Sequence, residues 1–315
     1  MIINKLAKDL SKYRRTMLFY QNARTAFEVY LRSLQFLENE KVLLPAFIGW
    51  SSREGSGVFD PVVKLGLSHA FYIVDENLNI DINSLEKEFI QQNVKLFVII
   101  HYFGYVDPHY KEAVAIARRH GAMVLEDEAH ALYTDVVGGA SGRLGDAAIF
   151  SLHKMLPVEY GGLLCINETS TSTGFISQNE PSIPFTSFDL VTIAKKRLEN
   201  ASALHSLLKN YTDQIILLRP KLNENEVPQT IPILIRSVSR DKLYELMNNA
   251  GYGVVTLYHT LIENISKENF PKSHYLAKRI LNLPVHQDIN LDNIPSMIGC
   301  LLECISKLKG NKSDV

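Results

Sequence analysis

Two residues that follow apolar runs could carry chemistry together. Asp127 comes shortly after the run 123–125, and Lys154 follows the run 147–150. A lysine can form a Schiff base with a carbonyl compound, and a buried carboxylate can keep a pyridine nitrogen protonated. Pyridoxal phosphate chemistry requires both groups, because the protonated ring then accepts electrons from the substrate. The pair therefore predicts a pyridoxal phosphate site.

Short apolar runs and helical patterns alternate through the first half of the chain. A helix is expected after Asn22, a typical N-cap residue, and another is expected to end at Gly121. Strand, helix and strand at this spacing indicate βαβ units, so we expect a mostly parallel sheet flanked by helices. Ligands bind at the carboxyl ends of the strands in such sheets. The predicted strands are 42–44, 69–74, 96–101, 123–125 and 147–150.

The second half has a different character. The Ser/Thr-rich segment after Ile166 is typical of an exposed loop. Beyond it we expect helices at 189–209, 241–250 and 291–308, and strands at 231–235 and 253–258. These elements predict an α/β protein with a large domain, 1–205, and a smaller C-terminal α+β domain, 206–315.

Composition excludes several classes of protein. The 315 residues carry 33 Lys and Arg against 34 Asp and Glu, a net charge of −1, so there is no basic excess for nucleic acid. No apolar run reaches the roughly 18–20 residues of a membrane span, and the amino terminus lacks the apolar block of a signal peptide. The three cysteines form no disulfide framework. These features predict a cytoplasmic protein that binds neither nucleic acid nor membranes.

Three other motifs that this region resembles lack the further residues that they require. The letters of Asp127 to His130 spell the DEAH box of helicases, but the chain has no Gly-Lys pair for a phosphate loop. Asp127, Glu128 and His130 could also bind a metal, yet no second cluster supports them, so no metal is predicted. The Ser-x-x-Lys of Ser151 to Lys154 lacks the other elements of penicillin-binding enzymes.

An ordered set of motifs resembles the DegT-type nucleotide-sugar aminotransferases, which have the aspartate-aminotransferase fold, the pyridoxal phosphate fold type I. The family phrase S-G-T-A at the start of the first long helix matches Asn22-Ala23-Arg24-Thr25-Ala26. The resemblance covers about 22–308. Its Ser-x-x-Lys spacing is two residues shorter than the usual S-x-H-x-x-K, and a G-x-N-x-R motif is absent from the Ser/Thr-rich segment. The matching motifs are Glu126-Asp127-Glu128-Ala129-His130-Ala131, Gly145-Asp146, Phe150-Ser151, Lys154, Gly161-Gly162 and the phrase Asn282 to Ile289.

The resemblance implies roles for individual residues. Lys154 would bond the cofactor and move the proton, Asp127 would pair with the ring nitrogen, and His130 would lie near the phenolic oxygen. A helix start near Arg24 would bind the cofactor phosphate, because its free N–H groups and dipole attract anions. The cofactor-binding set is therefore Arg24, Thr25, Ala26, Ser151, Asp127, His130 and an aromatic that covers the ring, with Trp50 and Phe47 as candidates.

The resemblance also implies an activity. We expect an amino group, from glutamate, to be transferred to a keto sugar carried by a nucleotide, by a homodimer. Tyr258, His259 and Arg240 are candidate substrate contacts, although each could equally be a surface or strand residue. Three alternatives stay open: sugar 3-dehydration, transamination of a small keto acid, and a non-catalytic regulatory relative.

Overall fold

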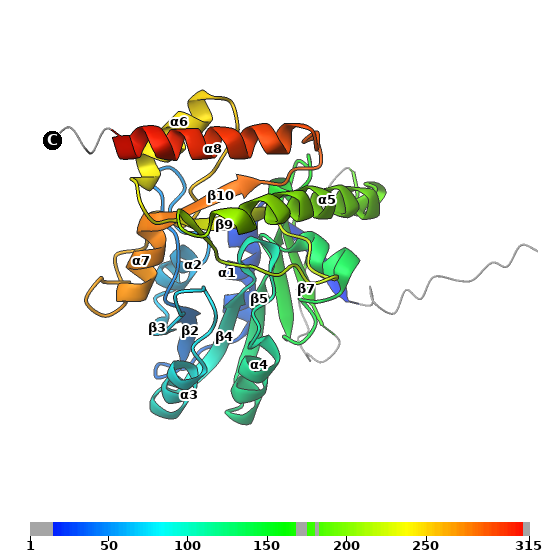
Figure 1. Ribbon diagram of the computed structural model, residues 1–315. Helices are drawn as coiled ribbons and strands as arrows, with labels where there is room; N and C mark the ends of the chain where they lie inside the picture. Colours follow the sequence, from blue (N-terminus) through cyan, green and yellow to red (C-terminus); the bar gives the residue numbers. More distant parts are fainter. Residues whose placement is uncertain (1–14, 168–174, 180–182, 311–315) are drawn as a thin grey trace, which may run out of the picture.

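The computed structural model describes residues 15–167, 175–179 and 183–310, and within them two sheets are flanked by helices (Figure 1). The Ser/Thr-rich segment expected as a loop lies largely outside the described residues. The strands of the large sheet are β1 (Thr16–Tyr20), β2 (Lys41–Pro45), β3 (Ser68–Tyr72), β4 (Val94–Ile100), β5 (Met123–Asp127), β6 (Ala147–Ser151) and β7 (Gly162–Ile166). Its helices are α1 (Ala23–Ser33), α2 (Phe59–Lys64), α3 (Ile82–Gln91) and α4 (Tyr110–Arg119).

The large sheet is mostly parallel, as the sequence predicts. Its seven strands run in the order β1-β7-β6-β5-β4-β2-β3. The strands β3, β2, β4, β5 and β6 pair in parallel, whereas β7 and β1 are antiparallel at one edge. This arrangement confirms the expected fold class and brings the carboxyl ends of β4, β5 and β6 together.

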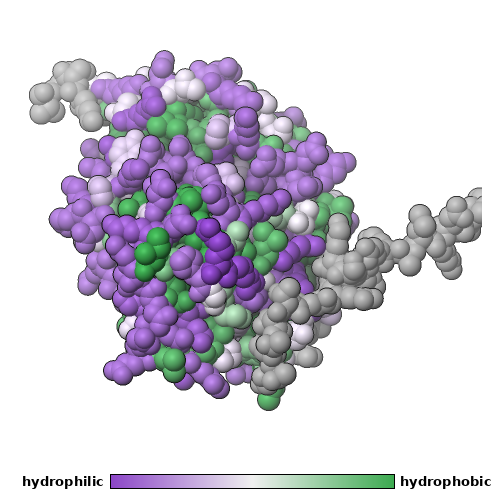
Figure 2. All heavy atoms as spheres, turned by 90° about the horizontal axis from the view of Figure 1, so that it is seen from below, coloured by the Kyte–Doolittle hydropathy of each residue, from purple (hydrophilic) through white to green (hydrophobic). Residues whose placement is uncertain are grey.

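Alternate side chains of β4 fill cores on opposite faces of the sheet. Leu96 and Val98 pack with residues of α1 and α2, while Phe97 and Ile99 pack with residues of α3 and α4. Successive side chains of a strand point to opposite faces, so a strand covered on both sides is apolar throughout. The face seen in Figure 2 is mainly hydrophilic, with smaller groups of hydrophobic residues between the polar ones.

The second half adds a three-stranded sheet with four further helices. The helix α5 starts where predicted, because the Asp189 side chain caps the N–H of Thr192. The small sheet has the order β10-β9-β8. These elements are α5 (Leu190–Leu208), β8 (Ile215–Leu217), β9 (Thr230–Ile235), α6 (Arg240–Asn249), α7 (Pro271–Arg279), β10 (Ile280–Pro284) and α8 (Asn293–Gly310).

The prediction of a strand at 253–258 is wrong. Val255 makes a single isolated bridge, to Asn282, and the segment continues into turns. Gly253 and Tyr258 both have positive φ, 60° and 59°, which a strand does not allow. The apolar residues of this segment pack against the protein from an irregular backbone and are not part of a hydrogen-bonded strand pair.

One hydrophobic core extends across the expected domain boundary. It contains Leu43 and Phe97 of the large sheet together with Leu204 of α5 and Leu281 of β10. The boundary at residue 205 stays a prediction. Among the described residues, no helix has the length and apolar character needed to cross a bilayer.

Candidate active site

Two adjacent parallel strands bring Asp127 and Lys154 to one cavity. Asp127 at the end of β5 is in register with Ile149 of β6, and the 3₁₀ turn 152–154 follows β6 directly. Both side chains line a cavity of about 660 Å³, which also contains His130 and Ser151. We call it the Lys154 cavity. Its volume is in the range of small-molecule sites, and it lies at the strand ends where such sheets bind ligands.

Asp127 is a buried carboxylate without a cationic partner. One oxygen accepts a hydrogen bond of 2.9 Å from the N–H of Ala129, and no described cation lies within ion-pair distance. Burial raises the pKa of Asp127, and the N–H of Ala129, Lys154 and His101 oppose this rise. A cation brought into the cavity would therefore stabilise the ionised form of this carboxyl group.

Lys154 lies against the imidazole of His130. Its Nζ is 3.3 Å from Nε2 of His130, and Nδ1 of the same ring accepts a hydrogen bond of 3.4 Å from the N–H of Phe103. This second bond places the ring proton on Nε2, where it can be donated to a neutral amine. Burial lowers the pKa of Lys154, although Asp127 and Glu54 raise it, and burial with Lys154 lowers the pKa of His130 well below its ordinary value. The arrangement favours a neutral, nucleophilic lysine.

The first turn of α1 forms one wall of the cavity. Asn22 accepts the N–H of Thr25 at 2.9 Å, as the sequence predicts for an N-cap, and Asn22, Ala23 and Arg24 line the cavity. Thr25 and Ala26 do not line it. The Thr25 hydroxyl donates to Asn22, and Ala26 is fully buried with its N–H bonded to the Asn22 carbonyl. Their contact with a cofactor stays a prediction.

Arg24 is held at the rim of the cavity. Its guanidinium donates to the Glu54 carbonyl and lies 3.7 Å from Asp60, while its buried Nε has no hydrogen-bond partner in the described part of the chain. Arg24 therefore links α1 to the segment 49–58, which also lines the cavity.

Gly161 and Gly162, at the start of β7, allow this strand to approach the turn after β6 and the N-cap of α1. A Cβ on Gly161 would lie 1.6 Å from Nδ1 of His153, and one on Gly162 would lie 2.3 Å from the carbonyl oxygen of Asn22. His153 in turn lies 3.3 Å from the hydroxyl of Ser151. Gly162 thus reflects close packing against backbone that no side chain would permit, whereas a side chain at Gly161 would require His153 to move.

An aromatic cluster around Tyr258 borders the cavity. The ring of Tyr258 lies 5.3 Å from Phe47, 5.2 Å from Tyr102, 5.7 Å from Phe103 and 5.8 Å from His130. Tyr258 and Phe103 both have φ of 59°, a conformation that costs energy for bulky residues. Tyr258 lines the cavity, whereas the candidate Phe47 is fully buried behind it.

Trp50, the other aromatic candidate, lies at the edge of the cavity. Its side chain lines the cavity, and 45% of the residue is exposed. No described aromatic ring stacks on it. Its role in covering a cofactor ring stays a prediction.

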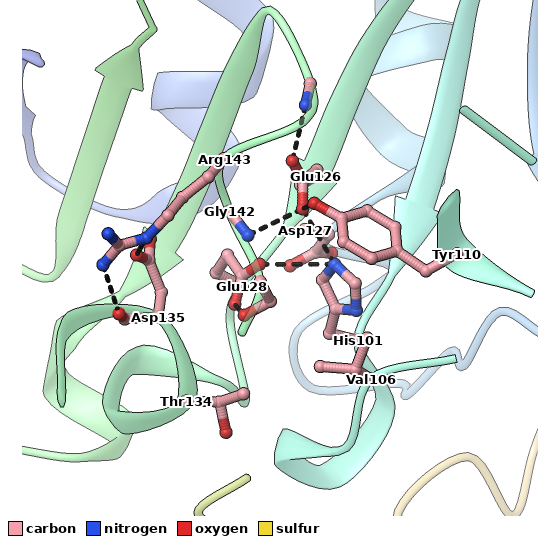
Figure 3. Close-up of polar contacts among 12 residues, drawn as sticks. His101, Val106, Tyr110, Glu126, Asp127, Glu128, Thr134, Asp135, Gly142 and Arg143 are labelled. Atoms are coloured by element: carbon pink, nitrogen blue, oxygen red, sulfur yellow. Dashed lines mark hydrogen bonds and ion pairs between the residues drawn. The ribbon is translucent and has the colours of Figure 1, made fainter. Parts of the chain in front are cut away.

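The side chains on either side of Asp127 in sequence belong to a separate, buried cluster (Figure 3). His101 donates to Glu126 at 2.9 Å and lies 3.4 Å from Glu128, and all three are fully buried. Glu126 also accepts hydrogen bonds from Tyr110 at 2.5 Å and from the N–H of Gly142 at 2.7 Å. The three ligand atoms are close enough to hold a metal, but the Glu126 oxygens are already occupied by donors.

The carboxylates control the charge of His101. Burial lowers the pKa of His101, but Glu128 and Glu126 outweigh this and raise it to about 9. Burial also raises the pKa of Glu126, yet hydrogen bonds from His101 and other donors reverse the effect and lower it. Burial holds the pKa of Glu128 well above its ordinary value. The cluster therefore contains an imidazolium–carboxylate pair, His101 with Glu126, beside Glu128, for which burial favours the protonated form.

Comparison with known proteins supports the family expected from the motifs. The model of the DegT/DnrJ/EryC1/StrS aminotransferase family matches residues 3–176 and 189–302. The chain is similar to the spore coat polysaccharide biosynthesis protein SpsC of Bacillus subtilis, with 35% identity over 116 residues that span 36% of this chain and 29% of that protein. It is also similar to a pleiotropic regulatory protein of Geobacillus stearothermophilus, with 22% identity over 91% of this chain and 85% of that protein.

The fold agrees with a solved structure of the same family. A DegT/DnrJ/EryC1/StrS aminotransferase from Brucella abortus superposes with a TM-score of 0.74 at 19% identity, over 94% of this chain and 88% of that one. The expected family, fold, cofactor class and enzyme class are therefore confirmed. The chain belongs to the DegT/DnrJ/EryC1/StrS aminotransferase family and is a pyridoxal-phosphate-dependent aminotransferase.

Proposed function

We propose that this aminotransferase transfers an amino group from glutamate to a keto sugar carried by a nucleotide, and that the product enters a surface polysaccharide. The similarity to SpsC, whose name refers to spore coat polysaccharide biosynthesis, supports the sugar substrate. One observation carries the proposal. A single cavity contains Lys154, the unpaired carboxylate of Asp127 and the first turn of α1.

These groups fit the chemical parts of pyridoxal phosphate. Asp127 would pair with the ring nitrogen, since its carboxylate lacks a cation. The N–H groups of Ala23 and Arg24 at the start of α1, with the hydroxyl of Ser151, would bind the phosphate. When bound, the cofactor supplies an electron sink for the substrate carbon next to the nitrogen.

Lys154, assisted by His130, would transfer the proton of the substrate carbon. A neutral Lys154 amine can take a proton from the substrate carbon, and burial, which lowers the pKa of Lys154, favours this neutral form. His130, whose Nε2 lies 3.3 Å from the amine, would orient it by donating a hydrogen bond. Since its own pKa is lowered, His130 stays neutral, and its Nε2–H can donate to the unprotonated amine.

A second candidate is a regulatory role for this member of the family. The similarity to the pleiotropic regulatory protein, which extends over 91% of this chain, favours it. Lys154 and Asp127 oriented into one cavity argue for retained chemistry, because a purely regulatory role requires neither. Sugar 3-dehydration would need a histidine in place of the lysine, and His153 instead contacts Ser151.

Assays with different acceptors test the proposal. Cofactor-loaded protein is incubated with glutamate and either nucleotide-linked keto sugars or small keto acids. We expect 2-oxoglutarate and an amino sugar by mass spectrometry, lost in Lys154→Ala and retained in the control Lys111→Ala, an exposed lysine on α4. Turnover of keto acids alone would contradict the sugar substrate. Cofactor binding without any amino transfer would favour the regulatory candidate.

We also propose that the protein is a cytoplasmic homodimer, as the resemblance to DegT-type enzymes implies. Light scattering of the purified protein tests the dimer, with a monomer mass as the contradicting result.

A further inference from the structure

A second cavity lies beside α6 and α7, outside the catalytic groups. It has a volume of about 540 Å³, similar to that of small-molecule sites. We call it the basic cavity. Its lining is formed by Arg240, Asp241, His259, Lys267, Pro271, His274, Tyr275, Ala277, Lys278 and Arg279.

Positive charge dominates this lining although the whole chain has a net charge of −1. Four permanent cations face a single carboxylate, that of Asp241. Arg240 already neutralises this carboxylate through an ion pair of 2.7 Å. The positive charges of Lys267, Lys278 and Arg279 are not neutralised, because none of them has an ion-pair partner among the described residues.

Arg240 gives the cavity a rigid base. Only 4% of its side chain is exposed, and besides the ion pair it donates a hydrogen bond of 2.8 Å to the carbonyl of Ile280. Arg279 is also ordered, since its guanidinium lies 4.2 Å above the ring of Tyr275. The start of α7 at Pro271 adds the positive end of a helix dipole. An anion entering the cavity would meet preorganised positive charge.

The basic cavity and the Lys154 cavity meet at one residue. His259 lines both the basic cavity and the Lys154 cavity, next to Tyr258 in the sequence. A ligand that fills both must have a small reactive part near Lys154 and an anionic part further out. A sugar linked to a nucleoside diphosphate has this form, whereas glutamate or a small keto acid does not.

We infer that the basic cavity binds the diphosphate of a nucleotide-linked sugar and thereby selects the substrate of the proposed function. Lys267, Lys278 and Arg279 neutralise the phosphate oxygens, and the sugar reaches past His259 toward Lys154. Arginine and lysine are the side chains that bind phosphate groups most strongly. Selection follows, because an acceptor without a diphosphate gains nothing from these charges.

Calorimetry with nucleoside diphosphates tests the inference. UDP, GDP and dTDP are titrated into the cofactor-loaded protein, and the variant Lys267→Gln with Lys278→Gln is compared with wild type. We expect binding of at least one diphosphate, competition by inorganic pyrophosphate, and about tenfold weaker binding in the variant. The matched control is Lys87→Gln with Lys111→Gln, which removes the same charge from exposed positions on α3 and α4 (Figure 1).

Steady-state kinetics give a second measurement. The Lys267→Gln, Lys278→Gln variant should raise KM for the nucleotide-linked sugar about tenfold and leave kcat unchanged, because the altered lysines do not line the Lys154 cavity. Unchanged diphosphate affinity in this variant, or equal loss in the Lys87 and Lys111 control, would overturn the inference.

The inference rests on the proposed function, but the two can fail separately. Amino transfer to a nucleotide-linked sugar with no effect of the double variant refutes only the basic cavity. Diphosphate binding that depends on Lys267 and Lys278 in a protein without amino transfer refutes only the proposed reaction.

Discussion

Replacing His101 with glutamine removes the imidazolium from the buried cluster while keeping a polar side chain of similar size. His101, Glu126 and Glu128 are fully buried, so solvent cannot compensate for the lost charge. Glu126 loses its 2.9 Å partner and Glu128 loses the cation 3.4 Å away. We therefore expect a large and pH-dependent loss of stability.

The magnitude follows from the pKa of His101. A rise from the ordinary value of 6.5 to about 9 corresponds to about 3 kcal/mol of stabilisation by the charged ring. Because the folded pKa is raised, this stabilisation is complete below about pH 6.5 and is lost as the pH rises through about 9. The free energy of unfolding of wild type should therefore fall across this window.

Urea unfolding at a series of pH values from about 6 to 10 measures this dependence. His101→Gln should be about 3 kcal/mol less stable than wild type near pH 7, and the difference should shrink toward pH 10. His109→Gln is the matched control, since His109 lies 3.6 Å from Glu112 but its side chain is 45% exposed. A constant difference between wild type and His101→Gln at all pH values would refute the reasoning.

Three further predictions concern the Lys154 cavity. Asp127→Asn should lower kcat/KM for amino transfer by roughly 10²–10⁴ without abolishing cofactor binding, and unchanged kinetics would contradict its pairing with the ring nitrogen. Gly161→Ala should weaken cofactor binding about tenfold, because the new Cβ would lie 1.6 Å from His153; Gly299→Ala, with no atom within 4 Å of the added Cβ, should not. Ser151→Ala should raise the Kd for pyridoxal phosphate about threefold to tenfold but leave pyridoxal unaffected, and an equal effect on both would exclude a phosphate contact.

The features that the sequence predicts correctly depend on local patterns. Apolar runs followed by Asp127 and Lys154 indicate parallel strands with their ends at one site, and the structure places both residues in one cavity. Asn22 caps a helix as predicted, and the helix expected from Asp189 starts there. Such signals work because the periodicity of a strand or the capping of a helix is contained within a few residues.

The features that the sequence does not predict depend on contacts between segments that are distant in the chain. Tyr258 reaches the aromatic cluster through a turn with positive φ, a conformation that a tyrosine does not signal. The pairing of His101 with Glu126 and Glu128 requires β4 and β5 to be adjacent. The basic cavity is lined by residues of α6, of α7 and of the segment between them, which lie apart in the sequence.

Borohydride reduction of the cofactor-loaded protein, followed by peptide mass mapping, tests the central claim most directly. Reduction makes the bond between the cofactor and its lysine permanent, so the labelled peptide identifies that lysine. The account predicts a single labelled peptide that contains Lys154 and that disappears in Lys154→Ala but persists in Lys111→Ala. A label on a different lysine, or no label at all, would contradict the assignment of Lys154 as the residue that bonds the cofactor.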